Sequence, residues 1–512
     1  MWSCGCGPDA GRGRGLYWWL PPTFSLALWY FIFRVLLILY GQCTSPLHLL
    51  QRREPLSKMS LTKHRTSFTA ADLAPISSAL AAANGAFLRH FPGETNRRQP
   101  AHTVYGGGHL FKADSAVKLG VVALRTLDEY APDAVSFAKA FQLNGTLEFA
   151  SILRARVASK LQREAVEDFR LDYEDGYGNR LDAEEDAHAA QGAVEVARGL
   201  AAGTLPPFIG IRLKPMNEDL RVRAMRTLDI FLTTLIAESG GKLPENFIIT
   251  IPKVQIPEQV TASVKLVELL EKHNKLPTGT LKLELMLETP QAIINRHGHL
   301  TLPSLIEAAQ GRCHGVHFGV YDYTAGRNIT AAYQAMGHDV CDFAREVMAV
   351  SLAGTGIFLS DGATNILPVA PHRLEPGGKL TEAQIGENRT VVHNAWRIGY
   401  RDTQHSLENG IYQGWDLHPA QFVARYAALY QFFLSGQESA SSRLKAFVGK
   451  AALASLHGDV FDDAATGQGL LNFFLRGISC GAISEEETLA TSLTLEEIRT
   501  RSFLKILMGR GK

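Results

Sequence analysis

Acidic residues recur in the central part of the chain at positions where they could act together. They lie in the segments LDYEDGYG, LETP, VYDY, LSDG and WDLHP, and they are Asp172, Glu174, Asp175, Glu288, Asp322, Asp361 and Asp416. Carboxylates that converge repel one another, so a site that keeps them ionised requires a cation. Oxygen ligands without a set of Cys and His ligands favour Mg²⁺ or Mn²⁺ over Zn²⁺.

Two basic residues follow apolar segments and could bind an anion beside such a cation. Arg212 lies in IRLKP (211–215) and Lys253 in IPKV (251–254). Their charges suit a substrate carboxylate or the oxygen of a developing enolate. For Arg212, a salt bridge to the carboxylates of 172–175 is an equally good interpretation, and both roles can hold together.

Histidines offer other chemistry. His314 and His317 form a His-x-x-His pattern that would also suit zinc. Because they precede the end of an apolar segment instead of following it, we interpret them as structural. His418 is a candidate for proton transfer if it faces the site, but Pro419 after it equally indicates the start of a helix.

Eight short apolar segments carry these residues, and helical patterns follow them. In 217–236 and 257–273, for example, apolar residues recur at three- and four-residue steps. Repeated alternation of strand and helix predicts parallel strands in a closed (β/α)8 TIM barrel, with an open doubly wound sheet as the alternative. The predicted strands are 102–105, 169–173, 208–213, 247–252, 281–288, 316–321, 357–359 and 414–417.

In the predicted barrel, these polar residues would lie close together in space. The C-terminal ends of parallel barrel strands face one common mouth, where such barrels place their active sites. Seven of the eight predicted strands end in polar or charged residues of this kind. One charged residue often ends a strand simply by reaching solvent, but packing does not explain the repetition.

Length and composition describe a protein with a large globular part. The chain has 512 residues, 46% of them hydrophobic and 20% charged, with a formal net charge of +1. A nearly neutral chain without a P-loop or an aromatic-basic stripe gives no support for nucleic-acid binding. Its 6 Cys are scattered without Cys-x-x-Cys spacing, which predicts neither a disulfide framework nor a zinc knuckle.

The beginning of the chain differs from the rest. Residues 16–40 are apolar apart from Arg34 and are long enough to span a bilayer. We interpret residues 1–58 as a signal-anchor or as a non-native extension, because the sequence from Met59 onward is ordinary for a globular protein. The body is expected in the cytoplasm, with membrane attachment only through residues 16–40.

Three further parts follow this leader. Residues 59–100 are expected to form an N-terminal helix and linker, residues 101–433 the catalytic TIM barrel, and residues 434–512 a C-terminal helical extension. Such C-terminal helices can cap a barrel or exchange with a neighbouring subunit, so we expect a homo-oligomer.

Taken as an ordered set, the motifs resemble the citrate lyase β-subunit / dihydroxyheptenedioate aldolase superfamily. The resemblance spans about residues 101–433 and implies a TIM barrel of the phosphoenolpyruvate/pyruvate type. The motifs are LDYEDGYG (171–178), IRLKP (211–215), IPKV (251–254), LMLETPQAI (285–293), FGVYDYTAG (318–326) and WDLHPAQ (415–421).

This resemblance implies roles for individual residues. Glu288 in L-x-E-T and Asp322 in F-G-x-x-D would be the magnesium ligands. Arg212 would contact the carboxylate and enolate of the substrate, and we place Lys253 and Asp172 beside it for substrate binding. The agreement with the charge argument made from the residues alone strengthens the expectation.

The implied reaction breaks or forms a carbon–carbon bond through an enolate stabilised by Mg²⁺ or Mn²⁺. The substrate would be a small hydroxy or oxo carboxylic acid or its thioester, and Glu174 or Asp175 would hold a water that moves the proton. Segments 102–114 and 365–412 depart from the superfamily pattern, so neither the substrate nor the use of coenzyme A is implied. The alternatives are a malate-synthase-like condensing acyltransferase and a catalytically silent barrel with a structural role.

Overall fold

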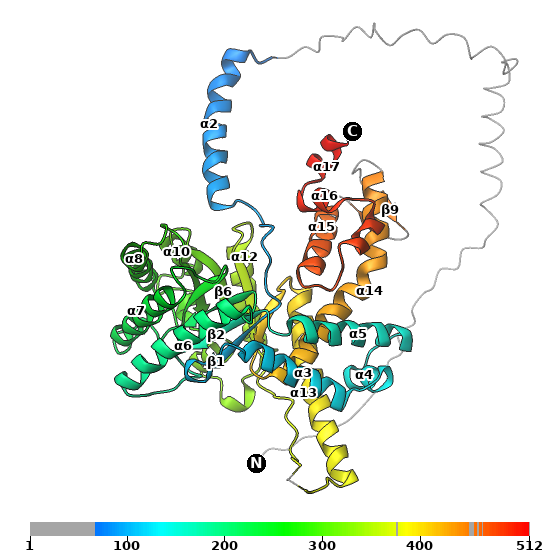
Figure 1. The fold of residues 1–512 in the computed structure, drawn as a ribbon. Helices are drawn as coiled ribbons and strands as arrows, with labels where there is room; N and C mark the ends of the chain where they lie inside the picture. Colours follow the sequence, from blue (N-terminus) through cyan, green and yellow to red (C-terminus); the bar gives the residue numbers. More distant parts are fainter. Residues whose placement is uncertain (1–66, 375–376, 450–454, 458–459, 463, 511–512) are drawn as a thin grey trace, which may run out of the picture. The chain divides into compact units, whose positions relative to one another are not determined.

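The computed structural model describes residues 67–374, 377–449, 455–457, 460–462 and 464–510, and Figure 1 shows the fold. It contains two compact units, the first ending at Leu80 and the second beginning at Ala81. In the first unit, the described residues form the beginning of helix α2 (Ala70–His90), where Thr69 and Asp72 exchange backbone and side-chain hydrogen bonds.

The apolar leader at residues 16–40 lies outside the described residues. Among the helices of the described ranges, none is long and apolar enough to cross a bilayer.

Eight parallel strands of the second unit close into a barrel. Each strand pairs with the next along the chain, and β8 returns to β1. This confirms the predicted (β/α)8 TIM barrel and excludes the open doubly wound sheet. The strands are β1 (His102–Gly107), β2 (Asp168–Asp172), β3 (Phe208–Arg212), β4 (Phe247–Ile251), β5 (Lys282–Leu287), β6 (Cys313–Phe318), β7 (Phe358–Ala363) and β8 (Gln413–Asp416).

Helices surround the barrel and continue beyond it (Figure 1). Those up to the last strand are α3 (Ser115–Tyr130), α4 (Ala134–Phe141), α5 (Leu147–Glu164), α6 (Asp182–Ala202), α7 (Arg221–Glu238), α8 (Pro257–His273), α9 (Pro290–Ile293), α10 (Leu302–Ala308), α11 (Val320–Gly326), α12 (Asp339–Leu352) and α13 (Glu382–Glu408). After β8 come α14 (Phe422–Gly449), the hairpin β9 (Ser455–His457) and β10 (Val460–Asp462), α15 (Ala464–Ser479), α16 (Leu495–Arg499) and α17 (Phe503–Gly509).

Each predicted strand overlaps one strand of the barrel, because runs of β-branched and aromatic residues mark buried strands well. The sixth prediction, 316–321, extends too far. Strand β6 ends at Phe318, and Gly319 caps helix α11. Asp322 therefore lies in the first turn of a helix and not at the end of a strand.

A polar network crosses the barrel interior. Arg170 on β2 bonds to Thr250 Oγ1 on β4 at 3.0 Å and to Glu284 Oε2 on β5 at 3.1 Å, and bonds between strands that are not neighbours must run through the interior. On β6, His317 contacts Glu284 Oε2 at 2.9 Å and the Tyr105 hydroxyl of β1 at 3.0 Å. These buried charges are paired, which offsets the cost of removing them from water.

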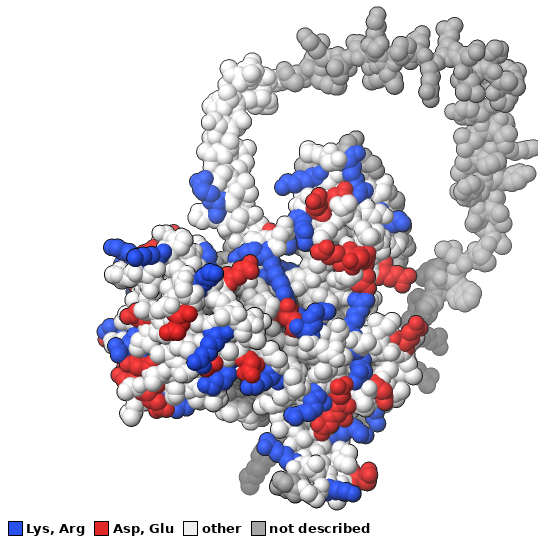
Figure 2. All heavy atoms as spheres, in the orientation of Figure 1, with Lys and Arg blue, Asp and Glu red and all other residues white. Residues whose placement is uncertain are grey.

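Helix α14 joins the barrel to the C-terminal helices. It packs against α5, α13 and α15, and it runs without interruption across residue 433. Its first turns are fully buried through Phe422, Tyr426, Tyr430 and Phe433. Figure 2 shows basic and acidic side chains interspersed over much of one face, in keeping with the net charge of +1.

Candidate active site

Asp172 and Arg212 form the base of a charged cluster at the C-terminal ends of the strands. They are the last residues of β2 and β3 and are paired in the register of the sheet. Arg212 Nε lies 2.7 Å from Asp172 Oδ1, and Arg212 Nη1 lies 2.9 Å from Glu174 Oε2. Burial favours a neutral Asp172, but Arg212 outweighs it and lowers the pKa of this carboxyl group.

The turn after β2 is folded around the Asp172 carboxylate. This carboxylate accepts hydrogen bonds from the backbone N–H groups of Glu174 at 2.9 Å and Gly176 at 2.7 Å. A Cβ atom on residue 176 would lie 2.5 Å from Asp172 Oδ2, so only glycine allows this approach. The D-x-E-D-G sequence thereby holds Glu174 and Asp175 at the mouth of the barrel.

Lys253 brings an ammonium group among these carboxylates. Its Nζ lies 2.7 Å from Glu174 Oε1, 3.2 Å from Asp175 Oδ2 and 3.4 Å from Asp322 Oδ2. The residue has a φ of +50°, a left-handed conformation that is unusual outside glycine and that tends to occur at functional sites. Burial would lower the pKa of Lys253, but Glu288 and Glu174 outweigh it and raise that pKa.

Glu288 lies behind the cluster, immediately after β5, and only 2% of it is exposed. Its Oε1 accepts the backbone N–H of Lys253 at 2.7 Å. Burial, together with the charges of Glu174 and Asp322, raises the pKa of Glu288 to about 8 despite Lys253. A Cβ atom on Gly319 would lie 2.5 Å from Glu288 Oε2, so glycine lets the start of α11 pass against this carboxylate.

The cluster contains more acidic than basic groups. Asp172 is compensated by Arg212, which leaves four carboxylates around the single ammonium of Lys253. Among the described residues, Glu174 Oε2 is buried and has no hydrogen-bond partner apart from its ion pair with Arg212. These oxygens fit a hard divalent cation. No group of three or more His, Cys, Asp or Glu side chains in the described part of the chain is arranged to hold a metal, so water or substrate would have to complete its shell.

Tyr105 also belongs to this site, and sequence reasoning missed it. The guanidinium carbon of Arg212 lies 4.8 Å from the centre of the Tyr105 ring, a cation–π distance. The Tyr105 hydroxyl contacts His317 Nδ1, and Trp415 Nε1, which can only donate a hydrogen bond, lies 3.0 Å from the same nitrogen. His317 Nδ1 is therefore an acceptor. The proton of the neutral ring is on Nε2, which faces Glu284. The sequence does contain a signal for Tyr105. Side chains of a strand alternate between its two faces, so Tyr105 lies on the same inward face of β1 as Thr103.

Comparison with known protein families shows which family the chain belongs to. Residues 80–506 match DUF6986, a family described as a domain of unknown function. The chain belongs to this family. No curated protein matches it in sequence.

The DUF6986 chain is similar to several solved structures. A citrate lyase from Burkholderia xenovorans LB400 is 16% identical, with 78% of this chain and 97% of that chain covered and a TM-score of 0.48. Protein CitE from Mycobacterium tuberculosis, in complex with magnesium, acetoacetate and coenzyme A, is 13% identical over 75% of this chain and 99% of its own, with a TM-score of 0.42. A Haloferax volcanii malate synthase in a pyruvate/acetyl-CoA ternary complex is 13% identical over 80% and 98%, with a TM-score of 0.39.

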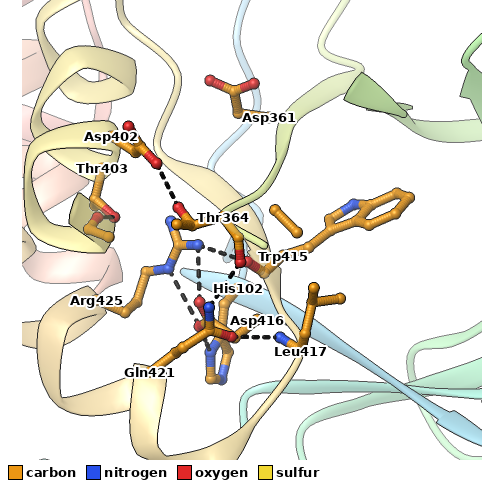
Figure 3. Close-up of polar contacts among 12 residues, drawn as sticks. His102, Asp361, Thr364, Asp402, Thr403, Trp415, Asp416, Leu417, Gln421 and Arg425 are labelled. Carbon is orange, nitrogen blue, oxygen red and sulfur yellow. Dashed lines mark hydrogen bonds and ion pairs between the residues drawn. The ribbon is translucent and has the colours of Figure 1, made fainter. Parts of the chain in front are cut away.

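Two other carboxylates on strands of the DUF6986 barrel do not belong to this cluster. Asp361 on β7 accepts from Arg345 Nε with both oxygens at 2.9 Å, and it also accepts the Ser406 hydroxyl at 2.6 Å and the backbone N–H of Gly362 at 2.8 Å. Asp416 on β8 lies 2.6 Å from His102 Nδ1 and 3.0 Å from Arg425 Nη2, and Figure 3 shows it pointing toward both partners. Both carboxylates are buried in structural ion pairs. The predicted residues that follow β2 to β5 therefore lie together at one mouth of the barrel, whereas Asp361 and Asp416 do not join them.

The histidines are likewise structural in this DUF6986 protein. His418 Nδ1 accepts the backbone N–H of Ala420 at 3.2 Å and caps the short 3-10 turn Pro419–Gln421. His317 lies in the interior network, and His314 Nδ1 lies 2.8 Å from Arg97 Nη1. The interpretation of His314 and His317 as structural agrees with these contacts.

Proposed function

We propose that this DUF6986 protein is a Mg²⁺-dependent carbon–carbon lyase of the aldolase or citrate-lyase type. The observation that carries the proposal is the charge imbalance at the mouth of the barrel. Glu174, Asp175, Glu288 and Asp322 surround one ammonium group, that of Lys253. A divalent cation would balance this charge at the place where TIM barrels carry out their chemistry.

Glu288 and Asp322 are the proposed metal ligands. Glu288 follows β5 and Asp322 lies in the first turn of α11, and Gly319 allows the start of α11 to approach the Glu288 carboxylate closely. Two carboxylates with water and substrate oxygens suit Mg²⁺, and Mn²⁺ has the same preference for oxygen. When bound, the metal supplies Lewis-acid stabilisation of negative charge on a substrate oxygen.

Arg212 is the proposed anchor for the substrate. Its Nε and Nη2 donate to Asp172, whereas Nη1 makes a long contact with Met286 Sδ at 3.9 Å and ion pairs with Glu174 and Asp175. Nη1 is therefore the donor best placed for a carboxylate or an enolate oxygen. Asp172 orients the guanidinium, and Lys253 adds positive charge nearby.

Glu174 and Asp175 are the proposed proton-transfer groups. Burial, assisted by the charge of Asp175, raises the pKa of Glu174 in spite of Arg212 and Lys253, so this carboxyl group can take up and release a proton closer to neutral pH. In the cleavage direction the carboxylate of Glu174 or Asp175 accepts the hydroxyl proton through a water that it holds, and the hydroxyl oxygen becomes a carbonyl oxygen. The carbon–carbon bond then breaks, its electron pair forms the enolate, and the proton returns to the enolate carbon.

The substrate class is a small hydroxy or oxo carboxylic acid or its thioester, including a coenzyme A ester. Residues 101–433 would form the catalytic domain of a homo-oligomer in the cytoplasm. Because every proposed site residue follows residue 101, a chain begun at Met59 should retain the activity.

The test is a turnover screen of the full chain with 4-hydroxy-2-oxo acids and acyl-coenzyme A esters, with and without Mg²⁺. Release of a 2-oxo acid or a thioester product only with Mg²⁺ would support the lyase. Condensation of acetyl-coenzyme A with an oxo acid would instead favour the malate-synthase-like alternative. Absence of both turnover and Mg²⁺ binding would favour the remaining alternative, a catalytically silent barrel with a structural role.

A further inference from the structure

A strongly basic cavity lies away from the candidate active site. It has a volume of about 370 Å³ and is formed by residues 96–98, the end of α5, and α15 and α16. Among its lining residues, seven are basic and one, Glu164, is acidic. The basic residues are Arg97, Arg98, Lys160, Arg163, Arg476, Arg499 and Arg501.

The contacts of the lining residues place this cavity by the N-terminal ends of the barrel strands. Arg97 bonds to His314, near the start of β6, and to the carbonyl oxygen of Gly356, just before β7. Arg98 pairs with Glu167, just before β2, at 3.1 Å. This is the face opposite the C-terminal mouth, so the cavity is separate from the cluster around Glu288.

Four of the seven cations already have carboxylate partners. Arg98 and Lys160 share Glu164 and Glu167. Arg476 pairs with Glu94 at 3.1 Å, and Arg499 with Glu485 at 3.5 Å. These ion pairs hold the walls of the cavity, and the four cations in them contribute no uncompensated positive charge.

Three guanidinium groups remain. Arg97, Arg163 and Arg501 form no ion pair with any carboxylate in the described part of the chain. Arg163 is exposed at the edge of the cavity, and burial lowers the pKa of Arg97. Three uncompensated positive charges in one cavity attract a multiply charged anion.

The guanidinium group of Arg501 is held in position by hydrogen bonds to neutral acceptors, which leave its positive charge uncompensated. It donates to Asn96 Oδ1 at 3.2 Å, to Asn472 Oδ1 at 3.2 Å and to the carbonyl oxygen of Thr95 at 3.0 Å. Its backbone has a φ of +50°, which is strained for a residue with a side chain. Burial and the charge of Arg476 lower the pKa of Arg501. The charged form of this residue is therefore less favourable than that of an exposed arginine, and a bound anion would stabilise it.

We propose that this cavity binds the phosphate groups of a small phosphorylated metabolite with at least two phosphate charges, such as a nucleoside diphosphate. Guanidinium groups match phosphate oxygens in bidentate geometry. The volume of about 370 Å³ is within the range of small-molecule sites. Figure 2 shows basic side chains gathered in the middle of the view, in the region between the segment before β1 and helices α5 and α15 of Figure 1. The proposal is independent of the lyase activity.

The test is calorimetric titration of the full chain with inorganic pyrophosphate and with ADP, in buffer without Mg²⁺. We expect both probes to bind the unchanged chain, and R163Q and R501Q each to weaken binding by about tenfold or more, since each removes charge-assisted hydrogen bonds. R221Q is the matched control, because Arg221 is an exposed arginine on α7 that pairs only with Glu218. It should bind as the unchanged chain does.

Two outcomes with the unchanged chain and R163Q would overturn the proposal, and a third concerns the control variant. One is the absence of binding by both probes. The other is equal affinity in R163Q and in the unchanged chain, and this variant decides the matter even if R501Q fails to fold, because Arg163 is exposed and makes no ion pair among the described residues. Equal weakening in R221Q would show that only general charge is being measured and would also contradict the proposal.

Discussion

Arg212 and Asp172 are register partners on adjacent strands, with Arg212 Nε 2.7 Å from Asp172 Oδ1. The ion pair is therefore placed by backbone pairing and does not depend on a mobile loop. Two of the three guanidinium nitrogens bond to this carboxylate, and the third, Nη1, forms an ion pair with Glu174 at the mouth of the barrel. This arrangement orients a cation before any substrate arrives, and such preorganisation is what electrostatic catalysis requires.

R212K should abolish turnover although it retains the charge, because a lysine cannot donate twice to Asp172 and also present a donor to the substrate. R212Q should in addition lower the free energy of unfolding by about 3–5 kcal/mol, because the buried Asp172 carboxylate loses the cation that pairs with it. Initial rates and denaturant unfolding measure the two effects, with R221Q as the control. Full activity in R212K would refute the role of Arg212.

E288Q and D322N should each abolish the thermal stabilisation produced by Mg²⁺ while leaving the fold intact. A ligand at 100 times its Kd stabilises a protein by about 2.7 kcal/mol, so the loss should be visible as a shift in Tm. E238Q, which changes an exposed residue at the end of α7, is the matched control and should retain the stabilisation. Unchanged Mg²⁺ binding in both site variants would show that the ligands are wrongly assigned.

G319A should weaken Mg²⁺ binding without touching any ligand. The added Cβ atom would lie 2.5 Å from Glu288 Oε2, so either the carboxylate or the start of α11 must move. G386A is the control, because a Cβ atom on this glycine of α13 meets nothing within 4 Å. The measurement is a Mg²⁺ titration followed by thermal unfolding, and equal affinities in the two variants would contradict the proposed packing.

Asp416 should contribute to stability against acid. Burial alone would raise the pKa of Asp416, but Arg425 and His102 outweigh burial and lower it to about 2. An aspartate in the unfolded chain has a pKa of about 3.9, so the contribution is complete above about pH 4 and disappears as the pH falls toward 2. Its size is about 2–3 kcal/mol.

The test of Asp416 compares unfolding at several values of pH. D416N should be less stable than the unchanged chain at pH 7, and the difference should shrink as the pH falls from 4 to 2. D182N is the control, because Asp182 is exposed in the first turn of α6. A difference that stays constant over this interval would show that the Asp416 charge does not act in this way.

Much of the fold could be predicted because its signals are local. Apolar runs of about five residues mark the strands, and three- and four-residue repeats mark the helices between them. The prediction was wrong where a single glycine ends a strand early, at Gly319, because the residues after it are as apolar and aromatic as the strand itself. Asp322 nevertheless lies beside Lys253, one of the residues with which it was grouped, although it was assigned to the wrong element.

The sequence by itself determined the alternation of strands and helices and the order of strand-end charges, since both depend on residues close together along the chain. Only the tertiary structure decided which charges act together. Arg345 from α12 and Arg425 from α14 neutralise Asp361 and Asp416, whereas no helix supplies an arginine to Glu174, Asp175, Glu288 or Asp322 in the described part of the chain. The physical reason is that the state of a buried carboxylate depends on the cation that packing brings to it.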